Sequence, residues 1–323
     1  MNKIALITGA TSGIGEGCAR RFARGGYNLI ITGRNTGKLE ILKKELEAEG
    51  TEVLALAFDV RNREAAKKAV DYIPDAWRNI DVLINNAGLA RGLEPEYEGD
   101  FEDWDQMIDT NIKGLLTMTR LIVPGMIKRN HGHIINIGSV AGDAAYAGGN
   151  VYCATKAAVK AISDGLRIDV AHTKVRVTNV KPGLVETNFS NVRFHGDNAR
   201  ADQVYRGITP LNGDDVADVA YYAASAPEHV QIAEVLVLAT HQANGTFWTL
   251  IIPMSMRSCS LPRQRSIPGL ILRCRTGATS SVHTALSPLP EEECEAEAWR
   301  MSAKKCGHWQ IRGTGKLWLP GFI

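Results

Sequence analysis

The chain has 323 residues, and 45% of them are hydrophobic, which is enough for a substantial buried core in one large domain or two ordinary ones. Its net charge of +2 at pH 7 excludes the strong positive field that would recruit nucleic acid or an acidic membrane surface. No apolar run approaches the ~18–20 residues needed to span a bilayer, so we expect neither a nucleic-acid partner nor a membrane partner.

The first predicted element is a buried strand at residues 3–7. Its apolar run, Ile4-Ala5-Leu6-Ile7, stops at a Thr-Gly turn. The run is shorter than the ~7–15 apolar residues of a signal peptide, so we expect a cytoplasmic protein. Cys18 and Cys153 are the only cysteines before residue 248 and both lie in predicted helices, so nothing suggests a disulfide framework.

Short apolar runs alternate with amphipathic stretches up to about residue 240. Runs that are apolar on both faces are typical of strands covered by helices on each side. The predicted strands are residues 3–7, 28–32, 53–58, 81–84, 133–138, 175–180 and 234–238, and the predicted helices are 14–25, 36–49, 62–72, 103–129, 151–172 and 213–225. This alternation predicts an α/β fold, a single doubly wound Rossmann domain with a mostly parallel sheet of about seven strands.

A glycine-rich turn, Thr8-Gly9-Ala10-Thr11-Ser12-Gly13-Ile14-Gly15, lies between the first strand and the first helix. Glycine permits a tight turn and lets the backbone approach a pyrophosphate, and the helix N-terminus supplies free N–H groups and a positive dipole end. A glycine cluster alone is weak evidence. Its place between a buried strand and a helix predicts a dinucleotide site.

The end of the second predicted strand indicates which dinucleotide binds. An NAD site usually carries Asp or Glu there, to accept a hydrogen bond from the ribose 2′-hydroxyl. This strand ends with Gly33-Arg34-Asn35, and the first acidic residue afterwards is Glu40. Arg34 can hold a 2′-phosphate through a charge-assisted bidentate pair, which predicts NADP as the cofactor. The alternative is that Arg34 is a solvated surface arginine.

Three polar residues, Ser139, Tyr152 and Lys156, form the predicted catalytic core. A spacing of four puts Tyr152 and Lys156 on one helix face, where the ammonium favours the phenolate and would bring a pKa of about 10 into a useful range. A Tyr four residues before a Lys is usually only a surface pair. Ser139, however, follows the strand at 133–138, at the carboxyl edge of the sheet where ligands bind. Its hydroxyl could hydrogen-bond a substrate oxygen.

Two further features that contain asparagine point to a site at the same edge of the sheet. Asn85-Asn86-Ala87-Gly88 follows the strand at 81–84, and Asn111 lies in the middle of the predicted helix 103–129, where Asn is unfavourable unless its side chain is used.

Together these motifs resemble the short-chain dehydrogenase/reductase family over residues 1 to about 247. The resemblance implies an NADP-dependent oxidoreductase that acts on CH–OH groups. Tyr152 would be the general acid/base and Ser139 would orient the substrate. Lys156 would lower the Tyr pKa and bind the nicotinamide ribose, and Asn111 would position a water in the proton relay. The cofactor-binding residues that the motifs and the resemblance together assign are Gly9, Thr11, Ser12, Gly13, Ile14, Gly15, Arg34, Asp59, Val60, Asn86, Ala87, Gly88, Tyr152, Lys156, Pro182, Gly183, Val185 and Thr187.

Within that family, several segments resemble the NADP-dependent 3-hydroxy acid dehydrogenases, among them residues 131–139 and 189–194. That subgroup implies serine, allo-threonine and 3-hydroxypropionate or malonic semialdehyde as substrates. A carboxylate substrate needs a cation, so Arg193 is the predicted clamp beside Ser139 and Tyr152, with Arg91 a weaker candidate. The alternative for Arg193 is a structural arginine packed by its stem. The residues around Thr187 differ from those of the subgroup.

Other functions remain open at this point. A reductase of another ketone, sugar or lipophilic carbonyl would make Arg193 irrelevant. A non-catalytic NADP-sensing protein would be expected to lack Tyr152 or Lys156, and both are present. The family also implies a homo-oligomer, a homotetramer or dimer.

Two segments show no clear periodicity. Residues 186–212 are either a substrate loop or lid, or a solvated connection. Residues 249–323 hold ten Lys/Arg against five Asp/Glu, whereas residues 1–248 hold 27 against 30. We therefore predict one domain at 1–248 and an atypical, irregular tail at 249–323, which is either disordered, a sequence artefact or a small appended binding module. The tail's four cysteines have no metal-ligand spacing, so no metal is expected.

Overall fold

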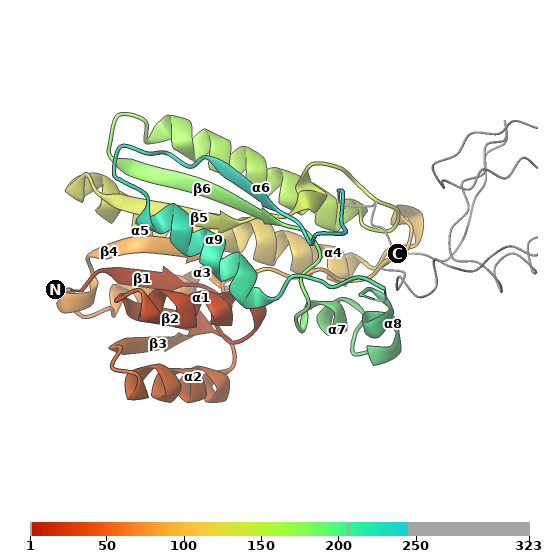
Figure 1. Ribbon diagram of the computed structural model, residues 1–323, viewed down its shortest axis with the longest axis horizontal. Helices are drawn as coiled ribbons and strands as arrows, with labels where there is room; N and C mark the ends of the chain where they lie inside the picture. The colour runs from red at the N-terminus through yellow and green to blue at the C-terminus, as the bar shows by residue number, and fades with distance from the viewer. Residues whose placement is uncertain (1, 206, 245–323) are drawn as a thin grey trace, which may run out of the picture. The chain divides into compact units, whose positions relative to one another are not determined.

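A computed structural model describes residues 2–205 and 207–244, and these form a seven-stranded sheet between two layers of helices (Figure 1). The strands are β1 (Ile4–Ile7), β2 (Asn28–Gly33), β3 (Val53–Ala57), β4 (Ile80–Asn85), β5 (Gly132–Ile137), β6 (Val175–Pro182) and β7 (Glu234–Val237). Their order is β3-β2-β1-β4-β5-β6-β7, and every neighbouring pair is parallel. The doubly wound fold and all seven predicted strands are confirmed.

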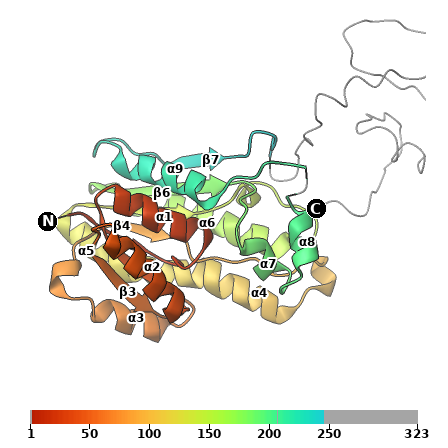
Figure 2. The ribbon, with the colours of Figure 1, turned by 60° about the horizontal axis from the view of Figure 1, so that its bottom comes forward.

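The helices cover both faces of the sheet (Figure 2). They are α1 (Gly13–Arg24), α2 (Thr36–Ala48), α3 (Arg63–Asp71), α4 (Phe101–Ile108), α5 (Leu115–Arg129), α6 (Asn150–Asp169), α7 (Phe189–Arg193), α8 (Asn198–Gln203) and α9 (Gly213–Ser225), with short 3₁₀ turns η1 (Asp75–Trp77), η2 (Glu96–Glu98) and η4 (Val140–Gly142). The prediction of one continuous α-helix over residues 103–129 is wrong. A π-helical segment, η3 (Asp109–Gly114), separates α4 from α5.

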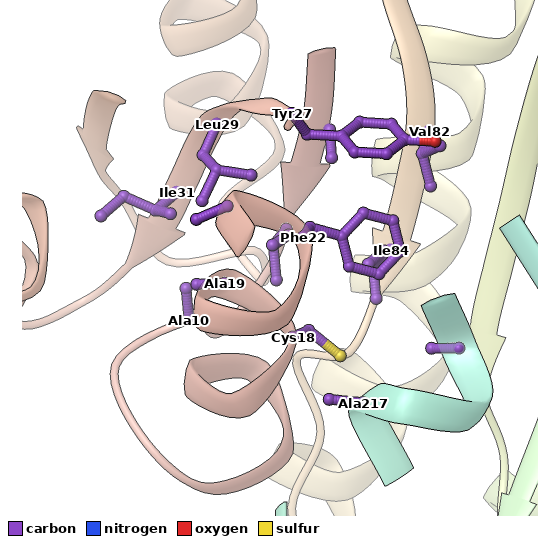
Figure 3. Close-up of a cluster of buried hydrophobic side chains, with 14 of the residues drawn as sticks. Ala10, Cys18, Ala19, Phe22, Tyr27, Leu29, Ile31, Val82, Ile84 and Ala217 are labelled. Atoms are coloured by element: carbon purple, nitrogen blue, oxygen red, sulfur yellow. The ribbon is translucent and has the colours of Figure 1, made fainter. Parts of the chain in front are cut away.

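The two faces of the sheet have separate apolar clusters. On one face, α1, α2 and α9 pack on the strands, and Figure 3 shows Phe22 and Cys18 of α1 projecting from the helix among side chains such as Ile84 of β4 and Ala217 of α9. On the other face, α3, α5 and α6 pack on side chains such as Leu6 and Ile134. The strands are apolar on both sides because both sides are covered.

The candidate site lies at the carboxyl edge of the sheet. The order reverses between β1 and β4, and parallel sheets bind ligands at such a switch point. The aperiodic stretch 186–212 connects β6 to α9 at this edge and contains α7 and α8 (Figure 1). These helices have five and six residues, which is too short for a helical period to be visible in the sequence.

The predicted tail, residues 249–323, and the end of the predicted domain lie outside the described residues. Within the part of the chain that is described, no helix is both long enough and apolar enough to cross a membrane.

His133 is buried in β5 and makes stability depend on pH. Its Nε2 lies 2.8 Å from Thr178 Oγ1, whose hydroxyl donates to the Ile232 carbonyl, so the ring is neutral with its proton on Nε2. Burial, with a smaller effect of Arg176, lowers the pKa of His133 from 6.5 to about 3. The unfolded chain therefore takes up the proton first as the pH falls, and stability is lost from about pH 6.5 down to about pH 3.

We expect the free energy of unfolding to fall by about 2 kcal/mol more in the wild type than in His133→Gln between pH 7 and pH 5, because this amount is the linkage contribution of His133. Denaturant titration at the two pH values measures it. His172→Gln, at an exposed histidine, is the matched control. Equal pH dependence in the wild type and His133→Gln would contradict the assignment.

Candidate active site

The glycine turn after β1 has the backbone that a dinucleotide phosphate requires. Gly9 and Gly13 have φ angles of +66° and +58°, which L side chains rarely adopt. A Cβ on Gly15 would lie 2.3 Å from both the Gly9 carbonyl oxygen and Asn86 Nδ2, so only glycine fits. Ser12, the N-cap of α1, makes no side-chain capping bond, which leaves the first N–H groups of α1 available to an anion.

The Asn86 segment holds this turn in place. Asn86 Nδ2 donates to the carbonyls of Thr8 and Gly9 at 2.9 and 3.0 Å. The backbone N–H groups of Asn86 and Ala87 both donate to Thr8 Oγ1 at 3.0 Å. The ends of β1 and β4 are therefore joined beneath the crevice, and Asn86 has a structural role in the phosphate turn.

The adenosine side of the site offers a cation at the expected place. Arg34 follows β2, is exposed and makes no hydrogen bond or ion pair with another described residue. Asp59, after β3, pairs with Arg61 at 2.8 Å. Although burial opposes it, the hydrogen bonds from Arg61 hold the pKa of Asp59 below its usual value. A Cβ on Gly114 would clash with the Val60 side chain, so the segment after β3 lies close to η3. These residues fit an NADP molecule.

Ser139, Tyr152 and Lys156 come together at the carboxyl end of β5. Lys156 Nζ donates to the Ile137 carbonyl at 2.9 Å and lies 5.9 Å from the centroid of the Tyr152 ring. Ser139 Oγ accepts from the Ala141 N–H at 3.1 Å, so its own proton can be donated to the Tyr152 hydroxyl or to a substrate oxygen. Ser139 and Lys156 are buried, at 8% and 7% exposure, while Tyr152 is partly buried.

The charge states of this group follow from burial. Burial lowers the pKa of Lys156 to about 8. Burial also raises the pKa of Tyr152, with a smaller contribution from Tyr146, while a hydrogen bond with Ser139 and the charge of Arg193 act in the opposite direction. Among the protein groups, desolvation of the phenolate has the largest effect on the Tyr152 pKa, and the lowering that the family resemblance assigns to Lys156 stays a prediction. Arg193 supplies the protein cation that opposes this effect.

The π-helical segment η3 turns Asn111 into the crevice. Its Oδ1 accepts from the Leu89 N–H at 2.9 Å, and its Nδ2 donates to the Leu89 carbonyl and to Thr155 Oγ1 at 2.8 and 3.0 Å. Both amide hydrogens are used, so the side chain can offer a water only its oxygen. Asn111 thus joins the segment after β4 to α6, where its partner Thr155 directly precedes Lys156. These contacts explain why an asparagine occurs inside a helical stretch.

Arg193 lies beside Tyr152. Its Nε donates to the Gly92 carbonyl at 3.0 Å and its Nη1 to the Tyr146 hydroxyl at 2.8 Å. The guanidinium carbon lies 5.9 Å from the centroid of the Tyr152 ring. Phe189, also on α7, packs edge-on against the same ring at 5.6 Å. Arg91 is turned towards the end of α7 and donates to the Val192 carbonyl at 2.9 Å.

The segment after β6 packs against the glycine turn. Thr187 packs on the glycine turn, since a Cβ on Gly13 would lie 2.9 Å from its Cγ2. Pro182 ends β6, Gly183 packs against the Gln242 side chain, and Val185 forms a bridge with Leu211. Tyr146, Phe189 and Gln242 were missed by the sequence analysis, because they belong to no local motif.

Comparison with known proteins gives one family. A sequence model described as short chain dehydrogenase matches residues 3–198. An NADP-dependent 3-hydroxy acid dehydrogenase of Salmonella typhi is 51% identical over 241 residues, which cover 74% of this chain and 96% of that protein. Sulfoacetaldehyde reductase 2 of Chromohalobacter salexigens is 45% identical over 248 residues, 76% of this chain and 98% of that protein. Among solved structures, the closed form of serine dehydrogenase complexed with NADP⁺ has a TM-score of 0.68 at 45% identity and covers 81% of this chain and 100% of that one.

Proposed function

Because this chain belongs to the short-chain dehydrogenase family, we propose that it transfers a hydride between NADP(H) and a short 3-hydroxy acid of the serine, allo-threonine and 3-hydroxypropionate class. The observation that carries the choice of substrate is the Arg193 guanidinium, held 5.9 Å from the Tyr152 ring. A cation this close to the Tyr152 ring suits a substrate whose carboxylate is only a few bonds from the reacting carbon.

The proposed chemistry divides between the residues at the end of β5. NADP, when bound, supplies the hydride acceptor or donor. Ser139 donates a hydrogen bond to the substrate oxygen, and Tyr152 Oη takes the proton of the hydroxyl during oxidation or returns it during reduction. Lys156, anchored to the Ile137 carbonyl, offers its remaining protons to a ribose hydroxyl beside Tyr152. Arg193 fixes the other end of the substrate.

The relatives support an anionic substrate. The names of two of them specify a 3-hydroxy acid and sulfoacetaldehyde, which both carry an anionic group near the reacting carbon. A carboxylate and a sulfonate can each accept a bidentate pair from a guanidinium.

We expect Arg193→Met to raise the KM for 3-hydroxypropionate roughly 30-fold or more, since truncating one partner of a charged pair costs about 2–5 kcal/mol. The KM for a neutral short alcohol should change little, because such a substrate has no anion for Arg193 to bind. Steady-state assays with NADP⁺ on both substrates measure the difference. Arg24→Met, at the far end of α1, is the matched control.

A panel of short hydroxy acids, polyols and ketones with NADP⁺ and NADPH tests the proposal as a whole. Preference for anionic substrates in the wild type, lost in Arg193→Met, is the expected result. Equal or better activity on neutral ketones or sugars would replace the 3-hydroxy acid proposal with the broader reductase activity.

We further propose a cytoplasmic homo-oligomer, a tetramer or dimer. Exposed apolar side chains on α5, α6 and β7 support it, namely Leu116, Ile127, Ile168 and Leu236.

A further inference from the structure

The segment Phe189–Gly196 carries two side chains that face Tyr152, yet its only helix, α7, has five residues. A helix of that length is not stable by itself. Its position must therefore come from contacts with the rest of the domain. Those contacts determine where Phe189 and Arg193 lie relative to Tyr152.

Two hydrogen bonds between Gly92 and Arg193 join this segment to the loop after β4. The Gly92 N–H donates to the Arg193 carbonyl at 3.0 Å, and Arg193 Nε donates back to the Gly92 carbonyl at 3.0 Å. Arg91 Nη1 donates to the Val192 carbonyl at 2.9 Å. Arg193 is thus held through its neighbours and through its own side chain.

His195 is the unusual residue of this segment. Its φ angle is +54°, and among the described residues only one other non-glycine, Asn130, has a positive φ. Asn130 ends helix α5, where asparagine commonly takes that conformation. At a histidine the left-handed conformation costs free energy and persists only when surrounding contacts impose it.

The contacts that impose it come from two other elements. His195 Nε2 lies 2.9 Å from Oδ2 of Asp103, a buried carboxylate in the first turn of α4. His195 Nδ1 lies 3.3 Å from Arg91 Nη1. Arginine can only donate, so Nδ1 is the acceptor and the ring proton sits on Nε2, from which it is donated to Asp103. One imidazole therefore joins Arg91, Asp103 and the end of α7.

We propose that His195 is a positioning residue for the substrate clamp. By bridging Asp103 and Arg91 it fixes the end of α7, and with it the guanidinium of Arg193 beside Tyr152. The inference rests on the proposed role of Arg193 as the anion clamp. It assigns His195 no contact with substrate or cofactor.

Three substitutions at this position separate the side chain from the backbone. His195→Gly removes the bridge and relieves the strained φ, so a purely structural turn would tolerate it. His195→Gln keeps a donor that reaches Asp103 and an acceptor for Arg91. His195→Phe keeps a planar ring but has no polar atoms.

We expect His195→Gly and His195→Phe to raise the KM for 3-hydroxypropionate roughly tenfold, because they lose a hydrogen bond to a charged group. The KM for NADP⁺ should stay within about twofold of the wild-type value. His195→Gln should restore most of the affinity. His229→Gly, at an exposed histidine, is the control. An unchanged KM in His195→Gly would overturn the proposal.

Hydrogen exchange gives a readout that does not need activity. Amides of residues 189–196 should exchange at least tenfold faster in His195→Gly and in Asp103→Ala, which removes the acceptor, than in the wild type, and the double variant should add little to either. Unchanged exchange overturns the bridge. If exchange rises as expected but the wild type does not use anionic substrates, the proposed function fails while the bridge stands.

Discussion

Replacing Tyr152 by phenylalanine is expected to lower kcat/KM by roughly 10²–10⁴-fold, the usual contribution of a positioned general acid or base. The substitution removes only the hydroxyl. The ring can keep its edge-on contact with Phe189 at 5.6 Å and its place near Lys156. We therefore expect the fold and the binding of NADPH to be unchanged, and the loss to fall on kcat.

The measurements that check this are steady-state kinetics in both directions and fluorescence titration of NADPH. Tyr222→Phe makes the same chemical change at an exposed tyrosine and should leave the kinetics unchanged. If Tyr152→Phe kept full activity while NADPH still bound, the proton would have to be carried by another group, and the assignment of Tyr152 would be abandoned.

The fold was predictable because its strands are covered on both faces. Apolar runs such as Leu29–Ile31 and Ile134–Ile135 have no polar alternation, and that pattern is typical of a parallel sheet between helices. The error over 103–129 also has a physical cause. A π-helical segment has almost the same residue pattern as an α-helix, so the extra residue in the ladder at Asp109–Gly114 leaves no sequence signal.

Candidate site residues were predictable only where residues close together in the sequence identify them. The glycine turn and the Tyr152–Lys156 pair depend on short spacings, and Ser139 depends on the end of one strand. Tyr146 and His195 act through contacts with Arg193 and Asp103, at sequence separations of 47 and 92 residues. No periodicity or motif links such positions, so they required the three-dimensional structure.

The pKa of Tyr152 depends on residues outside its own helix. A lysine four residues away on the same helix should favour the phenolate, but Lys156 donates one hydrogen bond to the Ile137 carbonyl and is itself desolvated. The protein charge that counters burial at Tyr152 comes from Arg193, on a different element.

Arg34→Asp is expected to shift the ratio of kcat/KM for NADP⁺ over NAD⁺ by about 10³-fold. Arg34 is exposed after β2 and free to pair with a 2′-phosphate, and loss of such a charge pair costs about 2–5 kcal/mol. The introduced carboxylate also repels the phosphate and can accept a hydrogen bond from a ribose 2′-hydroxyl. Both effects favour NAD⁺.

Kinetics with saturating hydroxy acid and varied NADP⁺ or NAD⁺ measure the ratio. Arg24→Asp makes the same change of charge in the last turn of α1, away from the glycine turn. It therefore separates a direct contact of Arg34 with the 2′-phosphate from a general electrostatic effect. The preference of the Arg34 variant should also depend less on salt, because the wild-type attraction for the phosphate is screened at high ionic strength. An unchanged preference for NADP⁺ in Arg34→Asp would mean that other groups read the 2′-phosphate, and the position after β2 would no longer explain cofactor choice.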